Sequence, residues 1–227
     1  MLRALTRTAG QSRDLDVSLD LLTDHLRCLG TLSREQKLLR SRLRAARARS
    51  RARMAEALMD LDIARLRRDL RAVLARRGEE IFAAKVRLRA TRDEQGEALL
   101  EEFTALNASF DPVALHALRR RARRLRYAAE VGDGVRGGNP SEAPALFKTL
   151  QERLGNLHDH HVLAAWLESQ AKSSEARGYA ALAGEARARR RWAEATAHEL
   201  HARLLEARPQ DIARRALEAM GRTRTAA

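Results

Sequence analysis

The sequence has few of the residues that cross-link or interrupt a chain. Cys28 is the single cysteine among 227 residues, which excludes an internal disulfide and a zinc site built from several cysteines. Only 4 Pro and 12 Gly are available to end helices, and aromatic residues make up 4%. The abundant Ala, Leu and Arg are strong helix formers, so the composition predicts an all-α protein.

Long apolar runs are also lacking. No stretch approaches the roughly 18 apolar residues that a membrane span needs, and the first residues lack the apolar core of a signal peptide. We therefore expect a soluble, cytoplasmic protein with no membrane partner. The chain carries 44 Lys and Arg against 30 Asp and Glu, a formal charge of +14. Such an excess bears on partners rather than on fold, and it favours a polyanion.

The stretch from Leu115 to Glu130, LHALRRRARRLRYAAE, concentrates this charge on one predicted helix. Asp111 followed by Pro112 is a favourable helix start, and we expect Gly132 and the glycine-rich segment GDGVRGGNP to end the helix. Its apolar stripe at helical spacing consists of Leu115, Leu118, Ala122, Leu125 and Ala129. The remaining surface carries His116, Arg119, Arg120, Arg123, Arg126 and Tyr127. Arginines three or four residues apart repel one another, so their density indicates an anionic partner.

Glycine, proline and capping residues predict where the other helices begin and end. Before the Leu115 stretch we expect helices ending near Gly10 and Gly30, a long helix from Ser33 to about Arg77, and a fourth over 81–110. After it we expect helices from Pro144 to Gly155, from Asp159 onwards, and over 175–207, ended by Pro209. The long helix places a basic row on one side, formed by Lys37, Arg40, Arg44, Arg47 and Arg51.

Two stretches of the chain resemble each other. GQSRDLDV at 10–17 aligns with GNLHDHHV at 155–162, which pairs Arg13 with His158 and, further upstream, Arg3 with Lys148. The chain therefore reads as a duplicated helical unit. The Leu115 helix precedes the second copy, whereas no such helix precedes the first. The predicted fold is a pseudo-symmetric bundle over 1–207, with halves 1–110 and 111–207 and long antiparallel helices. A short C-terminal helix and a basic tail are expected over 208–227.

The pair HALRRRARRLRYAAE and LQERLGNLHDHHV resembles the signature of the CHAD family, the conserved histidine α-helical domain. SRDLDV at 12–17 is similar to the first-half motif of that family. The resemblance covers roughly residues 1–207 and implies a two-halved helical bundle that binds inorganic polyphosphate without being an enzyme. The first helix of the family's first half has no counterpart here. We expect either a native start upstream of Met1 or a shortened member with an apolar groove and a tendency to dimerise.

Carried across by position, the resemblance implies a polyphosphate-binding set. Its members are His116, Arg119, Arg123, Arg126, Tyr127, Lys148 and His158, with Arg13 as the first-half counterpart of His158. To these we add Arg120, Arg3, Arg40, Arg44 and Arg47 from the basic rows. Arginine suits this ligand because its planar fork donates paired hydrogen bonds to phosphate oxygens and keeps its charge. Expected partners also include polyphosphate granules, a triphosphate-processing protein and a second copy of the chain.

Simpler interpretations stay open for each candidate. The arginine rows, including Arg187 to Arg191, also fit solvated helix faces, and His116 also fits a hydrogen bond to nearby backbone. Asp14 and Asp159 are better explained as helix caps than as catalytic acids. Trp166 and Trp192 are most simply packing residues. Neighbouring residues of a helix point in different directions, so we expect no metal at 158–161, and no cofactor. The alternatives in function are a basic helical protein that binds nucleic acid, a phosphoanhydride-cleaving enzyme, and a scaffold for an acidic protein.

Overall fold

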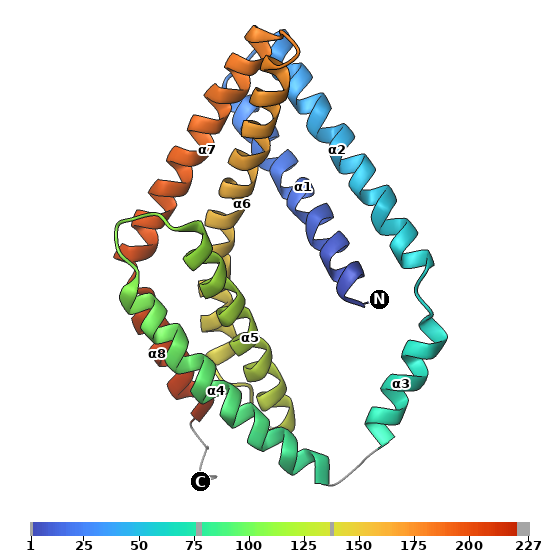
Figure 1. Ribbon diagram of the computed structural model, residues 1–227. Coiled ribbons are helices and arrows are strands. Elements are labelled where there is room, and N and C mark those ends of the chain that lie inside the picture. The colour runs from blue at the N-terminus through green and yellow to red at the C-terminus, as the bar shows by residue number, and fades with distance from the viewer. Residues whose placement is uncertain (1, 76–78, 137–138, 222–227) are drawn as a thin grey trace. The chain divides into compact units, whose positions relative to one another are not determined.

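The computed structural model is built of α-helices, with no strand in the part of the chain that it describes, residues 2–75, 79–136 and 139–221 (Figure 1). This confirms the predicted all-α class. The helices in chain order are α1 (Leu2–Cys28), α2 (Arg34–Met59), α3 (Ile63–Ala75), α4 (Glu79–Ala105), α5 (Pro112–Arg136), α6 (Ala143–Glu175), α7 (Ala180–Glu206) and α8 (Pro209–Gly221). Over those same ranges, none of the helices combines the length and the apolar character that crossing a bilayer requires.

The helices form two compact units. Unit 1 comprises Met1–Arg68 and Asp159–Ala197, and unit 2 comprises Asp69–His158 and His198–Ala227, so that α6 and α7 each contribute to both. The units group residues by contact, whereas the halves 1–110 and 111–207 were drawn from a sequence repeat. The pseudo-symmetry of those halves therefore stays a prediction.

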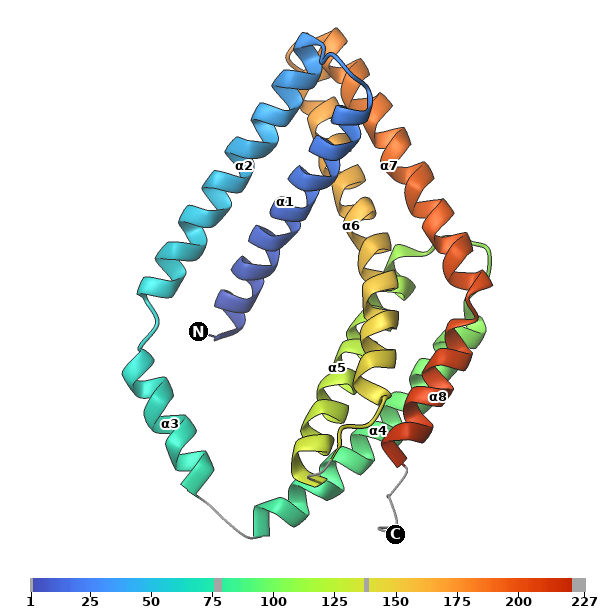
Figure 2. The ribbon, with the colours of Figure 1, turned by 180° about the vertical axis from the view of Figure 1, so that it is seen from behind.

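Unit 1 is held together by leucines of α1 and α2 packed against small and apolar residues of α6 and α7. The two N-terminal helices run side by side in both views (Figures 1 and 2). Fully buried leucines at their contact include Leu22, Leu26, Leu39 and Leu43. Trp166 and Trp192 pack against this core while remaining partly exposed, which confirms their predicted packing role.

In unit 2, the apolar side of α5 is buried in the core. All five residues of the predicted stripe are buried: Leu115, Leu118, Ala122, Leu125 and Ala129. Burying a leucine side chain contributes about 1.5–3 kcal/mol, so this stripe fixes the rotation of α5 about its own axis. The alanines of α8 join the same core. Leu217 of α8 packs closely on Gly96 of α4, because a Cβ built on Gly96 would lie only 2.7 Å from Leu217 Cδ2.

Several predicted helix ends are confirmed. Ser33 accepts a hydrogen bond from the backbone N–H of Gln36 and the Gln36 side chain returns one, so the capping box is present. Asp111 Oδ1 accepts from the backbone N–H groups of the residues that begin α5. Gly30 has a positive φ of 84° just beyond α1, a conformation that favours glycine.

The glycine stops predicted inside the motifs are wrong. Gly10 lies within α1 and Gly155 within α6. Helix α5 continues past Gly132 but ends at Arg136, inside the predicted glycine-rich segment. A helical glycine costs only about 1 kcal/mol relative to alanine, which packing of a long helix easily offsets. Asp14 and Asp159 consequently lie in helix interiors, so their predicted role as helix caps is also wrong.

The prediction of one uninterrupted helix from Ser33 to Arg77 is also wrong, because the helix is interrupted between α2 and α3. Asp60 ends α2, and Asp62 Oδ1 accepts a hydrogen bond from the backbone N–H of Arg65 at 2.8 Å. That bond satisfies an N–H group at the start of α3 that would otherwise lack a partner. Asp60 and Asp62 therefore mark the helix break, in a segment that contains no glycine or proline.

Candidate anion-binding face

The predicted residues of α5 share one side of the helix, next to its buried stripe. At 100° per residue, the positions from His116 to Tyr127 that carry the candidates fall within about 120° of the helix circumference. These positions are His116, Arg119, Arg120, Arg123, Arg126 and Tyr127. The stripe is buried, whereas His116, Arg120, Arg123 and Tyr127 on this side are exposed and Arg119 and Arg126 are partly exposed. We call these six residues, together with His158 and Gly155 of α6, the α5 face.

A histidine from each of two helices meets on the α5 face. The ring centroids of His116 and His158 lie 5.1 Å apart with the rings tilted by 41°. One turn further along α5, the Arg119 guanidinium lies against Gly155, with its Nε 3.8 Å from the position that a Cβ would take. As the residue number increases on α5 it decreases on α6, so the two helices run antiparallel here. The glycine that sequence reasoning took for a helix stop is thus a place of close approach.

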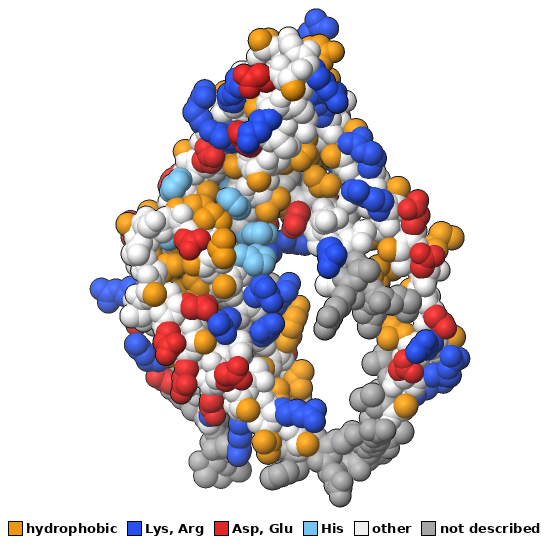
Figure 3. Space-filling model, in the orientation of Figure 1, with side chains coloured by type: hydrophobic (Ala, Val, Ile, Leu, Met, Phe, Trp, Pro, Cys, Tyr) orange, Lys and Arg blue, Asp and Glu red, His pale blue; other side chains and the backbone are white. Residues whose placement is uncertain are grey.

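The remaining cations of the α5 face differ in how they are held. Arg126 lies 4.8 Å from the centre of the Tyr127 ring and 3.5 Å from Glu130, so its charge is partly compensated. Arg120 and Arg123 are exposed and form no ion pair within the described residues. Figure 3 shows histidine side chains beside Lys and Arg side chains over the region of α5 and α6. The face therefore offers fixed and unpaired positive charge next to two titratable rings.

Lys148 lies ten residues before His158 on α6, or roughly 15 Å along the axis. Its Nζ is 3.7 Å from Glu152, and both side chains are about two-thirds exposed, so the pair is a weak surface one. Lys148 is therefore available to a ligand only in competition with that carboxylate.

In unit 1, Arg13 lies between two carboxylates. Its Nη1 is 3.8 Å from Asp14 and 3.6 Å from Asp159, which is buried in α6. Arg13 is half exposed, so it both compensates a buried charge and meets solvent. The structure thereby gives Asp159 an ion-pair role where the sequence had predicted a cap.

The basic row of α2 is partly neutralised. Arg47 and Arg51 both bind Asp16 of α1, the second at 3.0 Å. Burial alone would raise the pKa of Asp16, but the hydrogen bonds and charges of these two arginines lower it below its ordinary value. Arg40 and Arg44 form no ion pair within the described chain, and the side chain of Arg3 lies outside the described residues.

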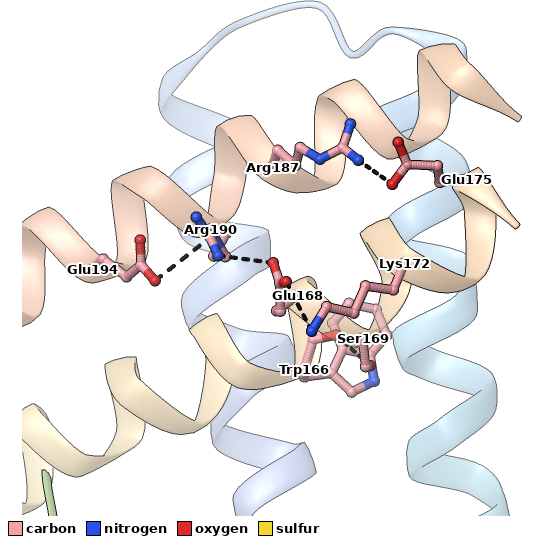
Figure 4. Close-up of polar contacts among 8 residues, drawn as sticks. All are labelled: Trp166, Glu168, Ser169, Lys172, Glu175, Arg187, Arg190 and Glu194. Atoms are coloured by element: carbon pink, nitrogen blue, oxygen red, sulfur yellow. Dashed lines mark hydrogen bonds and ion pairs between the residues drawn. The ribbon is translucent and has the colours of Figure 1, made fainter.

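The arginine cluster of α7 is tied to carboxylates, as Figure 4 shows. Arg190 donates to Glu168 at 2.8 Å and lies 3.7 Å from Glu194, while Arg187 pairs with Glu175. Hydrogen bonding by Lys172 and the charge of Arg190 outweigh burial and lower the pKa of Glu168. These contacts join α6 to α7 within unit 1, so the structural interpretation of this cluster is favoured.

Three further observations concern metal ligands, a pocket and Arg121. Among the described residues no three His, Cys, Asp or Glu side chains are grouped to hold a metal ion. Unit 2 also has a pocket of about 270 Å³ between α6 and α7, and none of the predicted residues lines it. Arg121, on the other side of α5, bonds Glu102 and Gln95 of α4 and so serves packing, although the sequence offers no sign that separates it from its neighbours.

The fold and this face define an all-helical protein with an arginine- and histidine-lined surface. A family model described as the CHAD domain matches residues 1–168 of the 227. The chain therefore belongs to the CHAD-domain family, as its motifs predicted. No curated protein and no solved structure matches it.

Proposed function

We propose that the protein binds inorganic polyphosphate on the α5 face and that it acts as a binding module rather than an enzyme. The observation that carries the proposal is the row of cations beside the buried stripe of α5, which ends at the neighbouring rings of His116 and His158. Membership of the CHAD-domain family supports the same ligand class.

A linear polyanion suits this geometry better than a compact anion does. Arg119, Arg123 and Arg126 follow one another at three- or four-residue spacing, so roughly 10 Å of helix presents guanidinium groups in a row. Each can donate two parallel hydrogen bonds to phosphate oxygens. Polyphosphate repeats its charge along the chain, so successive phosphates can bind successive arginines. The protein then needs no further feature of the ligand for recognition.

The histidine pair can add hydrogen-bond donors beside the arginine row. The ring centroids of His116 and His158 lie 5.1 Å apart, so both rings can face one bound polyanion. A protonated imidazole donates from both of its ring nitrogens.

The proposal excludes catalysis because phosphoanhydride cleavage generally uses a carboxylate-held divalent ion to neutralise developing charge. Glu130, a carboxylate beside the arginine row, is itself engaged with Arg126. Incubation with long-chain polyphosphate and Mg²⁺ is expected to release no phosphate. Steady release that depends on Mg²⁺ would replace the binding module with an enzyme.

The proposal is tested by measuring the affinity for long-chain polyphosphate across a salt series, with duplex DNA as competitor. We expect tight binding that weakens steeply with salt, because counterions are released from the ligand. Duplex DNA is expected not to displace polyphosphate at comparable phosphate concentration. Displacement by DNA would instead favour the nucleic-acid alternative, and binding indifferent to salt would contradict both.

A further inference from the structure

We infer that the pocket between α6 and α7 in unit 2 binds a small carboxylate with an apolar tail. The inference concerns a site separate from the α5 face and does not depend on polyphosphate binding. The pocket has a volume of about 270 Å³, and all of its lining residues belong to unit 2. They are Arg153, Asn156, Leu200, Arg203, Leu204 and Ala207.

The pocket and the α5 face use different sides of α6. Arg153 and Asn156 are three residues apart, so they share one side of the helix. At 100° per residue, Gly155, against which Arg119 lies, is about 160° around the helix from Arg153. A ligand in the pocket therefore does not take the place of one on the α5 face.

The α7 side of the pocket is largely apolar. Leu200, Arg203 and Leu204 lie at helical spacing on α7, and Ala207 follows just beyond its end. Leu204 is buried, whereas Leu200 and Ala207 are partly buried, so this wall is open to solvent. An apolar tail that covers the wall removes hydrocarbon surface from water. Inorganic phosphate has no such part and would leave the wall wet.

Two arginines supply the charge of the pocket, and they are held differently. Arg203 forms an exposed ion pair with Glu199, one turn earlier on α7. Arg153 is exposed and forms no ion pair within the described residues, so its charge is uncompensated. Its planar guanidinium can donate two parallel hydrogen bonds to a carboxylate, and the amide of Asn156 lies one turn away.

Neighbouring carboxylates limit the ligand to a single negative charge. None of the lining residues is acidic, but Glu199 is engaged with Arg203 and Glu152 with Lys148. Glu206 is exposed and directly precedes Ala207 in the sequence. A monoanion can pair with Arg153, whereas a dianion such as a phosphate monoester meets more repulsion from these glutamates.

The size of the pocket limits the length of the tail. Pockets that hold drug-sized molecules typically have about 300–1,000 Å³, so a pocket of about 270 Å³ suits a ligand of about ten non-hydrogen atoms. Octanoate has this size, a single charge and an apolar tail, and it therefore serves as the probe.

The test is an NMR titration of the full chain with octanoate, in which the methyl signals of the leucines are followed. Octanoate is expected to shift the signals of Leu200 and Leu204 in a saturable way. Two control ligands each lack one part of the probe. Butyrate, with a shorter tail, should bind at least tenfold more weakly, and 1-octanol, without the charge, at least threefold more weakly. Equal affinity for the three ligands, or no saturable shift at these two leucines, would overturn the inference.

A pair of matched variants tests the charge. Arg153→Gln removes the uncompensated guanidinium at an exposed position and is expected to weaken octanoate binding at least fivefold. Arg67→Gln makes the same change at an exposed arginine of α3 and should leave the affinity unchanged. Full octanoate affinity in Arg153→Gln, or equal losses in both variants, would refute a carboxylate site in this pocket. Failure here leaves polyphosphate binding by the α5 face untouched.

Discussion

The Arg119 guanidinium occupies the space beside Gly155 that a larger side chain would fill, with its Nε 3.8 Å from the position of a Cβ. An alanine Cβ at that distance makes ordinary van der Waals contact, whereas a branched side chain would displace the guanidinium. The glycine of the motif therefore controls where an arginine of the α5 face can lie.

Substitution at Gly155 is expected to separate stability from binding. Gly155→Ala should leave polyphosphate affinity unchanged and raise the free energy of unfolding by about 0.5–1 kcal/mol, because alanine favours a helix interior. Gly155→Leu should lower the affinity about tenfold by pushing Arg119 away. Urea unfolding and a titration with polyphosphate measure the two effects, and equal affinity of the leucine variant would show that Arg119 does not bind the ligand.

The histidine pair is expected to contribute to binding, because both rings lie beside the arginine row of the α5 face. His116→Ala/His158→Ala should lower the affinity for long-chain polyphosphate about fivefold at constant pH and salt, since it removes hydrogen-bond donors worth about 1 kcal/mol in total. An unchanged affinity in the double variant would show that neither ring binds the ligand.

The sequence was sufficient to predict the helical class and the side of α5 that carries the candidates, because both follow from local periodicity. It misplaced the ends of α1 and α6, since a glycine alone does not show whether packing will offset its cost. The break before α3 had a local sign, Asp62, that could have been recognised as an N-cap. Which arginines are neutralised was not predictable. Arg47 and Arg190 bind carboxylates from other helices, and such contacts depend on tertiary packing.

Two histidines, the partly buried His25 and the buried His201, are expected to make the free protein acid-sensitive. Burial and the nearby Arg189 lower the pKa of His25, despite the opposing Glu185, while burial and His198 lower that of His201. The unfolded chain then binds more protons below its ordinary histidine pKa of about 6.5, so the free energy of unfolding falls as the pH drops through that value. The loss should not exceed about 1.4 kcal/mol per pH unit for each histidine.

Urea unfolding between pH 7.5 and 5.5 measures this loss. His201→Leu should reduce it, because the buried Nε2 of His201 makes no hydrogen bond within the described residues and an apolar side chain of similar size can replace the ring. Asp16 does not contribute in this range. Its lowered pKa stabilises the fold at all pH values above its ordinary 3.8 and is lost only on further acidification. Identical pH profiles for the parent and the leucine variant would exclude His201 as a cause.

Arg13 is expected to affect stability through its ion pair with the buried Asp159. Arg13→Ala leaves that carboxylate with less compensation and should cost about 1 kcal/mol, a value limited by the exposure of Arg13. In Asp159→Asn the charge is absent, so adding Arg13→Ala should then cost much less. A double-mutant cycle by urea unfolding measures the difference. Strictly additive effects would mean that the two side chains do not interact.

The central claim is tested most directly by comparing two triple variants of equal charge. Arg119→Ala/Arg123→Ala/Arg126→Ala removes the row on α5, while Arg67→Ala/Arg68→Ala/Arg71→Ala removes three exposed arginines of α3. The measurement is the affinity for long-chain polyphosphate from low to high salt. The α5 variant should lose roughly 100-fold in affinity, at about 1 kcal/mol per arginine, and its log–log salt slope should flatten by about 2. The α3 variant should stay within a few-fold of the parent. Equal losses in both variants would mean that polyphosphate follows net charge alone, which would contradict a binding site on the α5 face.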